Sequence, residues 1–236
     1  MAKILNIETS SYACSVALCQ NGEISDFIET IEDKSHASLL TVLISNILKK
    51  NNLKVSELDA VSVSKGPGSY TGLRIGVSAA KGICYGANIP LLSVCSLHSM
   101  SYGIVHDKKY MENIPAVDHT VLCPMIDARR MEVYTAMFDI NSKQTGEIKA
   151  LIIEKDTFSD MLDTGKMIFF GNGADKCKQV IKHKNALFID GFHPSARYMS
   201  VISEENYNTN IFENTAYFEP FYLKDFIPTV PKNKII

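Results

Sequence analysis

The chain has 236 residues, of which 46% are hydrophobic, and this is enough for one large domain or two small domains with a substantial core. The formal net charge of −2 at pH 7 argues against tight autonomous binding to nucleic acid, so we expect any contact with RNA to run through a partner. Six cysteines without a C-x-x-C pair, and no apolar run of membrane length, predict a cytoplasmic protein with reduced thiols, no structural zinc and no membrane association.

Three strands and a helix are predicted in the first 50 residues. Apolar or alternating residues place strands at 3–7, 14–19 and 23–30, and Asn21-Gly22 marks a hairpin turn between the last two. A helix is expected over residues 36–50, with Ser35 as its cap. Its leucines and isoleucines fall in two adjacent rows, so its apolar face is wider than one sheet needs.

A glycine-rich turn follows the next strand, which is expected at 60–63. The chain passes through this turn into a helix expected over residues 73–87, in the run Lys65-Gly66-Pro67-Gly68-Ser69-Tyr70-Thr71-Gly72-Leu73-Arg74-Ile75-Gly76. Backbone N–H groups and the positive end of the helix dipole converge at such a turn, where an anion is the natural ligand. The Gly-Lys-Ser/Thr ending of a Walker P-loop is absent.

Arg74 stands in the first turn of this helix, where a cation opposes the helix dipole. We therefore expect Arg74 to face a negative group rather than solvent. That group is either a phosphate or carboxylate of a ligand or partner, or an acidic side chain of the same chain, and the sequence leaves both open.

Glycine recurs at four-residue spacing at both ends of the 73–87 helix, as Gly72 and Gly76 and again as Gly82 and Gly86. A glycine inside a helix costs on the order of 1 kcal/mol relative to alanine, and close approach of another backbone is the usual reason to accept that cost. The approaching element is either the 36–50 helix of the same chain or a second chain. In the second case the expected partner interface comprises His36, Leu39, Leu40, Leu43, Ile44, Ile47, Gly72, Leu73, Gly76, Ala79, Ala80 and Ile83.

The rest of the chain repeats the opening scheme. Further elements are expected as a strand at 89–94, a helix at 96–105, a polar connector at 106–120, strands at 121–127, 132–138, 150–153 and 167–170, a helix at 176–182, and a tail at 220–224 that packs on the body. Twice an apolar strand ends in an acidic residue and turns into a second strand, at Glu8 and at Asp127. This internal duplication predicts an α/β protein of two ribonuclease-H-like or actin-like (ASKHA) lobes with mixed sheets, residues 1–105 and a smaller lobe of residues 106–236.

Four parts of the chain carry a further pattern. They are Ile4-Leu5-Asn6-Ile7-Glu8-Thr9-Ser10 with Cys14-Ser15-Val16-Ala17-Leu18, the run from Gly66 to Gly76 with Ala80-Lys81-Gly82, Asp127-Ala128-Arg129-Arg130-x-Glu132-Val133-Tyr134, and the tail from Pro220 to Lys224. Together they resemble the bacterial TsaB (YeaZ-like) family. The glycine-rich run is shared with the catalytic paralogue TsaD, whereas the block that begins at Asp127 favours TsaB; residues 144–214 carry little of the pattern.

This resemblance implies a part in making N6-threonylcarbamoyladenosine (t6A) at position 37 of tRNAs that read codons beginning with A. It implies a non-catalytic scaffold that pairs with and activates TsaD, which transfers the threonylcarbamoyl group from an adenylate to tRNA. A small ATPase, TsaE, is a further expected partner, and the chain alone is expected to form a homodimer through the same helical face. The tRNA is expected to be reached only through the complex.

Departures from the catalytic paralogue support this role. Where the paralogue has two metal-binding histidines, this chain has Ser96 and Met100, and neither is a suitable ligand for that metal. Glu8 stands where nucleotide-binding relatives keep an aspartate, and the glycine expected after it is missing. No metal or cofactor is therefore expected on the chain alone, whereas ATP or ADP with magnesium is a candidate ligand at the interface of the complex. Candidate anion or nucleotide contacts are Glu8, Gly66, Gly68, Ser69, Thr71, Arg74, Asp127, Arg129 and Arg130.

Two enzymatic alternatives stay open. The residue types of a glycoprotease-like peptidase are present as Ser10, Ser35, Ser69, His36 and Asp127, although no Gly-x-Ser-x-Gly elbow presents a serine. A stand-alone ATPase or kinase needs phosphate-binding turns in both lobes, and only weak versions occur, at 8–11 and 171–173. Glu8 and Asp127 either share a magnesium ion across the cleft or each accept hydrogen bonds from their own turn.

Overall fold

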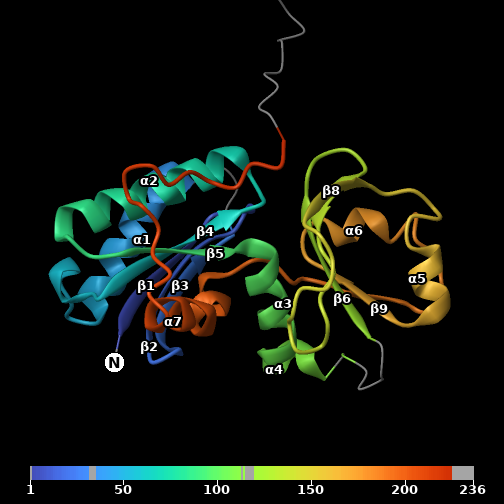
Figure 1. The fold of residues 1–236 in the computed structure, drawn as a ribbon, viewed down its shortest axis with the longest axis horizontal. Helices are drawn as coiled ribbons and strands as arrows, with labels where there is room; N and C mark the ends of the chain where they lie inside the picture. Colours follow the sequence, from blue (N-terminus) through green and yellow to red (C-terminus); the bar gives the residue numbers. More distant parts are fainter. Residues whose placement is uncertain (1, 32–35, 113, 115–119, 225–236) are drawn as a thin grey trace, which may run out of the picture.

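The computed structural model describes residues 2–31, 36–112, 114 and 120–224. Two five-stranded sheets stand side by side, each with its own helices, so the chain is an α/β protein of two lobes (Figure 1). Ser35, the expected cap of the first helix, lies outside the described residues. No helix within these ranges combines the length and the apolarity that crossing a bilayer requires.

The sheet of the first lobe comprises β1 (Lys3–Glu8), β2 (Cys14–Gln20), β3 (Glu23–Thr30), β4 (Ala60–Gly66) and β5 (Leu91–Cys95). Its strand order is β3-β2-β1-β4-β5; β1, β2 and β3 are joined antiparallel, and β4 and β5 run parallel to β1. The hairpin between β2 and β3 turns at Asn21 and Gly22, whose φ angles of 56° and 76° are those that the Asn-Gly pair predicts.

The sheet of the second lobe comprises β6 (Val121–Asp127), β7 (Glu132–Thr135), β8 (Lys149–Ile152), β9 (Met167–Phe170) and β10 (Ala186–Ile189). In the order β10-β9-β6-β7-β8, β6 has an antiparallel neighbour on one side and a parallel neighbour on the other, as β1 has in the first sheet. The predicted internal duplication and the predicted fold of two mixed actin-like lobes are therefore confirmed.

Among the described residues, three helices cover the two faces of the first sheet, and a fourth lies between the lobes. Two long helices, α1 (His36–Lys50) and α2 (Tyr70–Ala87), pack on one face of its sheet, and α7 (Ser200–Asn208) packs on the other face. The α1 helix has the predicted bounds, whereas α2 begins at Tyr70 rather than at residue 73 because Ser69 caps it. The helix α3 (Ser96–His106) lies between the lobes, against β5 and β6.

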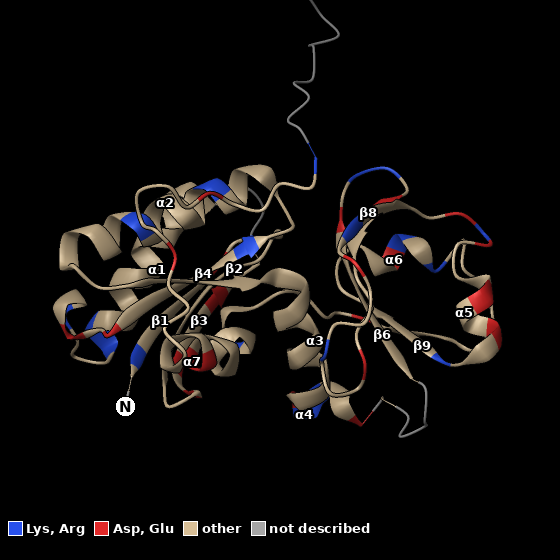
Figure 2. Ribbon diagram, viewed as in Figure 1, with Lys and Arg blue, Asp and Glu red and all other residues tan. Residues whose placement is uncertain are grey.

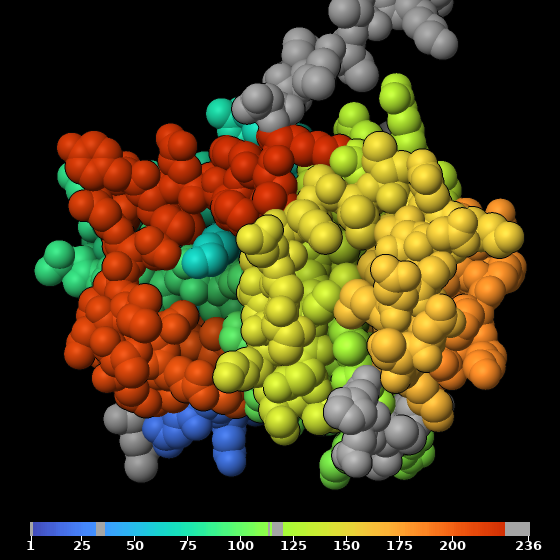
Figure 3. Space-filling view, turned by 45° about the vertical axis from the view of Figure 1, so that its right-hand side comes forward, coloured from blue at the N-terminus to red at the C-terminus, as the bar shows by residue number. Residues whose placement is uncertain are grey.

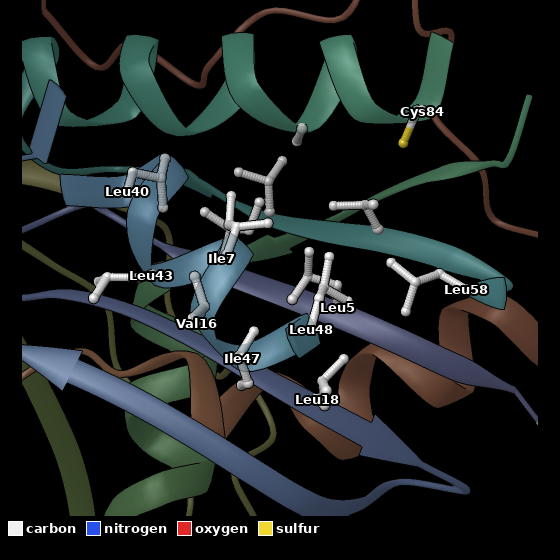
Figure 4. Packing of buried hydrophobic residues seen from close by; sticks show 14 of the residues in the cluster. Leu5, Ile7, Val16, Leu18, Leu40, Leu43, Ile47, Leu48, Leu58 and Cys84 are labelled. Atoms are coloured by element: carbon white, nitrogen blue, oxygen red, sulfur yellow. The ribbon is translucent and has the colours of Figure 1, made fainter. Parts of the chain in front are cut away.

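Each lobe has its own apolar core. In the first lobe, Leu40 and Ile47 of α1 pack with Ile7 and Val16 of the sheet (Figure 4). Burying a side chain of this size contributes about 1.5–3 kcal/mol. The core of the second lobe is richer in aromatic rings, with Phe138, Phe169 and Phe170 fully buried.

Short elements account for most of the differences from prediction. The helix expected at 176–182 is the single turn α6 (Ala174–Cys177), because the chain then turns, with Val180 N–H donating to Cys177 O (3.0 Å), and directs Ile181 into the core. The strand expected at 132–138 ends at Thr135. Elements that were not predicted are β10, α7, α4 (Lys108–Met111), α5 (Ser159–Thr164), and the 3-10 turns η1 (Val55–Glu57) and η2 (Ala196–Met199).

The chain returns to the first lobe after completing the second. Ser203 Oγ on α7 donates to Asn6 Oδ1 on β1 (2.7 Å), and Ala196 N–H donates to Ser15 Oγ on β2 (2.9 Å). This differs from the predicted division, which assigned all of residues 106–236 to the second lobe. The physical reason is that the second face of the first sheet carries apolar residues such as Ile4 and Leu92 beside polar residues such as Asn6, and α7 buries both kinds.

A C-terminal segment, residues 213–224, runs along α2 (Figure 1). On the surface, the red segment reaches the yellow-green second lobe (Figure 3). Lys81 Nζ on α2 donates to two of its carbonyl oxygens, and Phe221 N–H donates to Lys65 O (2.7 Å). At its end Lys224 forms an ion pair with Glu132 on β7. The segment therefore joins the two lobes at the edge where the glycine-rich turn lies.

Candidate functional site

The glycine-rich turn is fastened to the segment that follows β1. Ser69 N–H donates to Ser10 O (2.6 Å), and a methyl group on Gly68 would overlap the same carbonyl. Ser69 Oγ in turn accepts from Gly72 N–H (3.3 Å) and caps α2. Two backbone N–H groups that the sequence predicted would bind an anion, those of Ser69 and Gly72, thus donate hydrogen bonds within the protein.

Glycines at the two ends of α2 have different neighbours. A Cβ on Gly72 would overlap Thr9 O, and a Cβ on Gly76 would overlap Thr9 Oγ1. The close approach at these two glycines is therefore to the segment after β1, which corrects the expectation of a neighbouring helix or a second chain. At Gly82 and Gly86 a Cβ would meet nothing within 4 Å, so this end of the helix presents an open face.

Glu8 lies under this contact, fully buried at the end of β1. Its Oε1 accepts from Ser10 N–H (2.6 Å), and its Oε2 has no hydrogen-bond partner among the described residues. Burial raises the pKa of Glu8 above its usual range, although hydrogen bonds from Ser10 and Ser64 act in the opposite direction. Because it is inaccessible to solvent, Glu8 cannot touch a ligand in this conformation.

Asp127 stands at the end of β6, exposed to solvent. It accepts from Arg129 N–H (3.1 Å) and forms an ion pair with Lys176. Glu8 and Asp127 each accept a hydrogen bond from their own turn, as one of the two alternatives for the acidic pair expects. Within the described ranges, no three His, Cys, Asp or Glu side chains gather in a way that suits a metal ion.

The remaining candidate anion contacts divide by exposure. Gly66 is buried and Gly68 is partly buried, whereas the side chains exposed to solvent are Ser69, Thr71, Arg74, Arg129 and Arg130. Arg74 lies over the Tyr70 ring, with its guanidinium carbon 4.9 Å from the ring centroid, and forms no ion pair with any described acidic residue. The ion pair between Arg74 and an acidic side chain of the same chain, which the sequence left open, is therefore not formed among the described residues.

The residue types of a peptidase are not brought together. Ser69 Oγ caps a helix, Ser10 Oγ is buried without a described hydrogen-bond partner, and His36 Nε2 lies 3.2 Å from Ala13 O. Asp127, as described above, pairs with a lysine. None of these groups is hydrogen-bonded to another, so no relay of nucleophile, base and acid forms among the described residues.

The second expected phosphate turn, residues 171–173, packs on the core. A Cβ on Gly171, whose φ is 103°, would overlap Met125 O and the Met100 side chain, and Gly173 N–H donates to Met125 O (2.9 Å). Met100 is fully buried here, and so is Ser96, the other residue at a position where the paralogue has histidine. This turn therefore serves packing between β6, β9 and α3.

The open face of α1 and α2 forms an apolar groove, which we call the α1–α2 groove, with a volume of about 770 Å³. Its lining combines isoleucine, leucine and valine side chains with small residues of α2 and two lysines. Its lining residues are Thr41, Ile44, Ser45, Leu48, Lys49, Leu53, Lys54, Val55, Ser56, Ser78, Ala79, Gly82, Ile83, Gly86 and Ala87. A surface of this kind is typical of a helix-binding or subunit-binding site.

The expected partner interface coincides with this groove only in part. Ile44, Ala79 and Ile83 line the groove. The side chains that instead lie in the chain's own core are Leu40, Leu43, Ile47, Leu73 and Ala80, and His36 and Leu39 lie outside the groove. Gly82 and Gly86 also line the groove but are not in the expected set, although their four-residue spacing in the sequence marks this end of the helix.

Comparisons with known proteins agree with the predicted resemblance. The family model described as TsaD, tRNA N6-adenosine threonylcarbamoyltransferase, matches residues 28–225. A curated protein of Escherichia coli (strain K12), named tRNA threonylcarbamoyladenosine biosynthesis protein TsaB, is 27% identical over 229 residues, which are 94% of this chain and 95% of that protein. The protein of the same name from Buchnera aphidicola subsp. Acyrthosiphon pisum is 32% identical over 165 residues, 69% of this chain and 70% of that protein.

A solved structure shares the fold. YeaZ from Pseudomonas aeruginosa superimposes with a TM-score of 0.79 at 22% sequence identity, covering 94% of this chain and 100% of that chain. Family model, curated relatives and fold thus point the same way, and this chain belongs to the family of the tRNA N6-adenosine threonylcarbamoyltransferase TsaD and, within it, to the TsaB (YeaZ-like) proteins.

Proposed function

We propose that this chain is a non-catalytic subunit for t6A formation in tRNA, and that it acts by pairing with a TsaD-type catalytic subunit. Its curated relatives are named tRNA threonylcarbamoyladenosine biosynthesis proteins, which supports the pathway. The observation that carries the pairing is the α1–α2 groove, an apolar surface that nothing in the described chain covers.

The groove suits close helix packing. Gly82 and Gly86 leave the backbone of α2 open, so a partner helix can approach to the short end of the usual 8–10 Å range between helix axes. Val55 and Ile83 then lose contact with water, which is the main favourable term in such an association. We expect the chain alone to form a homodimer through this groove, and the TsaD-type subunit to compete with the second copy.

The proposed lack of catalysis is supported by the positions of the residues that could take part in chemistry. Glu8 is buried, Ser96 and Met100 lie in the core, and Asp127 is paired with Lys176. The proposal places any ATP or ADP with magnesium at the interface of the complex, beside the exposed part of the glycine-rich turn. It also assigns a TsaE-type ATPase as a further partner and the cytoplasm as the compartment.

Pairing is tested by size-exclusion chromatography with light scattering, on this chain mixed with the TsaD-type protein of the same organism. Gly82→Arg places a long side chain in the groove at a position with open space, so the fold is expected to survive. Asn46→Arg, on the exposed surface of α1 outside the groove, is the matched control. Leu40→Glu and Gly76→Arg are unsuitable as tests, because both positions are buried and the variants would unfold.

We expect the wild type and Asn46→Arg to form a mixed species and Gly82→Arg to elute separately, with thermal unfolding midpoints close to that of the wild type. Normal pairing by a folded Gly82→Arg variant would show that the groove is not the interface. Failure of the wild type to form a mixed species would remove the basis of the proposed function.

A further inference from the structure

Arginine is rare in this chain and unevenly placed. Of the 24 basic residues only four are arginines: Arg74, Arg129, Arg130 and Arg197. Arg197 has a structural role, because it pairs with Asp107 (3.4 Å). The other three are exposed: Arg74 lies on α2, and Arg129 and Arg130 lie on the turn between β6 and β7. Figure 2 shows basic residues on α2 and on the loop at the top of the second lobe.

The two acidic side chains beside the β6–β7 turn are paired with lysines, whereas Glu219, which like Arg74 acts electrostatically on Tyr222, forms no ion pair with a described residue. Asp127 pairs with Lys176, and Glu132 pairs with Lys224. Among the described residues, none forms an ion pair with the guanidinium groups of the three exposed arginines. Their charges are therefore available to an external anion.

The end of the C-terminal segment brings the two groups of arginines together. The Arg74 guanidinium approaches Tyr222 closely enough to act against the rise that burial causes in the pKa of Tyr222. Two residues later, Lys224 lies 6.0 Å from the Tyr134 ring centroid, and Arg129 acts electrostatically on that same ring. Because two residues span at most about 7 Å, the arginines of the two lobes flank one short stretch of chain.

The fold itself does not call for arginine in the β6–β7 turn. Arg129 and Arg130 both have positive φ angles, 69° and 50°, a region where glycine, asparagine and aspartate are favoured over other residues. Both side chains are exposed and gain nothing from core packing. Two adjacent arginines in this conformation are explained better by an anion that they bind than by the turn that they form.

We propose that Arg74, Arg129 and Arg130 form an arginine rim that contacts phosphate groups of the tRNA backbone in the complex; this inference rests on the proposed function. Guanidinium groups bind phosphate oxygens in a bidentate manner. Tyr70 and Tyr222 lie beside the rim with their ring centroids 4.8 Å apart, and Arg74 lies over the Tyr70 ring. The exposed part of the Tyr222 ring is therefore the surface left for contact with an unpaired base.

Aromatic rings among arginines favour RNA over an acidic protein segment as the ligand. With a net charge of −2, the chain cannot hold RNA tightly by itself. The rim is therefore expected to extend a tRNA-binding surface that the partner subunit provides. Contacts of this kind carry no base specificity, and the rim is expected to position the tRNA rather than to select it.

The test uses the complex of this chain with the TsaD-type protein and an unmodified tRNA that has adenosine at position 37, with affinity measured over a series of salt concentrations. The rim variant is Arg129→Asn with Arg130→Asn, since asparagine tolerates positive φ. The control, Lys155→Gln with Lys182→Gln, removes the same charge from exposed positions outside the rim that form no ion pair with described residues. Arg74→Gln tests the other lobe.

We expect the slope of log affinity against log salt to fall by about 1 for each rim arginine removed, with weaker tRNA binding and unchanged pairing between the subunits. The control is expected to leave the slope close to that of the wild type. Equal effects of rim and control variants would show that only net charge matters, and would overturn the proposal.

Two other outcomes would also overturn it. Loss of subunit pairing in the rim variants would mean that the arginines bind an acidic protein surface. Loss of ATP binding with tRNA affinity unchanged would mean that the phosphates belong to a nucleotide. If the wild-type subunits do not pair at all, the proposed function itself is wrong. Light scattering detects that result directly and so distinguishes it from a failure of the arginine rim alone.

Discussion

Gly76 of α2 lies directly on Thr9, so closely that a methyl group on the glycine would overlap the threonine Oγ1. This contact fixes the start of α2 on the segment that follows β1. Six residues further along the same helix, Gly82 faces open space in the α1–α2 groove. One helix therefore uses glycine for internal packing at one end and offers an open backbone at the other.

This difference gives a prediction for two matched substitutions. Gly76→Ala is expected to destabilise the protein by about 1–3 kcal/mol, because the added methyl group must displace Thr9. Gly82→Ala is expected to stabilise it by up to about 1 kcal/mol through helix propensity. Urea unfolding of both variants measures these changes, and equal effects of the two would contradict the assigned neighbours.

The buried carboxyl of Glu8 predicts a pH dependence of stability. Burial raises the folded-state pKa of Glu8 above its ordinary value, so in the pH range between the two values the folded protein binds more protons than the unfolded chain. The free energy of unfolding therefore falls as pH rises through this range, by at most about 1.4 kcal/mol per pH unit for one group.

Glu8→Gln, which cannot ionise and keeps an oxygen for Ser10 N–H, is expected to remove this fall. The difference in unfolding free energy between variant and wild type, measured by urea unfolding from pH 4 to pH 8, is expected to shift in favour of the variant as pH rises. Parallel profiles would show that Glu8 is not the group responsible.

Thiol reactivity provides a third test. Five of the six cysteines are buried, and burial raises the pKa of Cys14, Cys19, Cys84 and Cys177 to about 11 and that of Cys123 to about 12. At pH 8 such thiols carry roughly 0.1% or less thiolate, the reactive form. We expect at most Cys95, which is partly exposed, to react with an aromatic disulfide reagent within minutes, and all six to react after unfolding. Fast reaction of several thiols in the native protein would contradict the packing described.

The C-terminal segment predicts unequal effects at two neighbouring positions. Tyr222→Ala removes a ring that packs 4.8 Å from Tyr70 and is expected to cost about 1–2 kcal/mol of unfolding free energy. Lys224→Ala removes a surface ion pair with Glu132 and is expected to cost less than about 1 kcal/mol. Denaturant unfolding compares them, and a larger cost for the lysine would mean that the ion pair, rather than the rings, holds the segment.

Local patterns predicted much of the fold. Features that depend on residues close together in the sequence were predicted. They are the Asn21-Gly22 turn, the bounds of α1 and the two strand pairs that end in acidic residues. The position of α7 on the first sheet was not accessible in this way, because contacts such as Ser203 with Asn6 join residues that are almost 200 positions apart.

The same distinction applies to the candidate site. The glycine spacing of α2 predicted a close approach, and the structure shows one at Gly72 and Gly76 but not at Gly82 and Gly86. The spacing did not predict the partner, since nothing in it distinguishes Thr9 from a helix. The leucines of α1 form a wide apolar face in the sequence, yet the sheet and α2 cover most of it, and the groove retains only the part near Ile44 and Leu48. Burial of this kind depends on tertiary packing that one sequence does not reveal.

The measurement that tests the central claim most directly is t6A formation by defined mixtures of purified proteins, followed by nucleoside mass spectrometry. The mixtures contain unmodified tRNA, the threonylcarbamoyl adenylate donor, a fixed amount of the TsaD-type protein and increasing amounts of this chain. The account predicts no t6A with this chain alone, and a yield that rises with added chain and saturates at equal amounts of the two subunits. Formation of t6A by this chain alone, or a yield that does not change as it is added, would contradict the account.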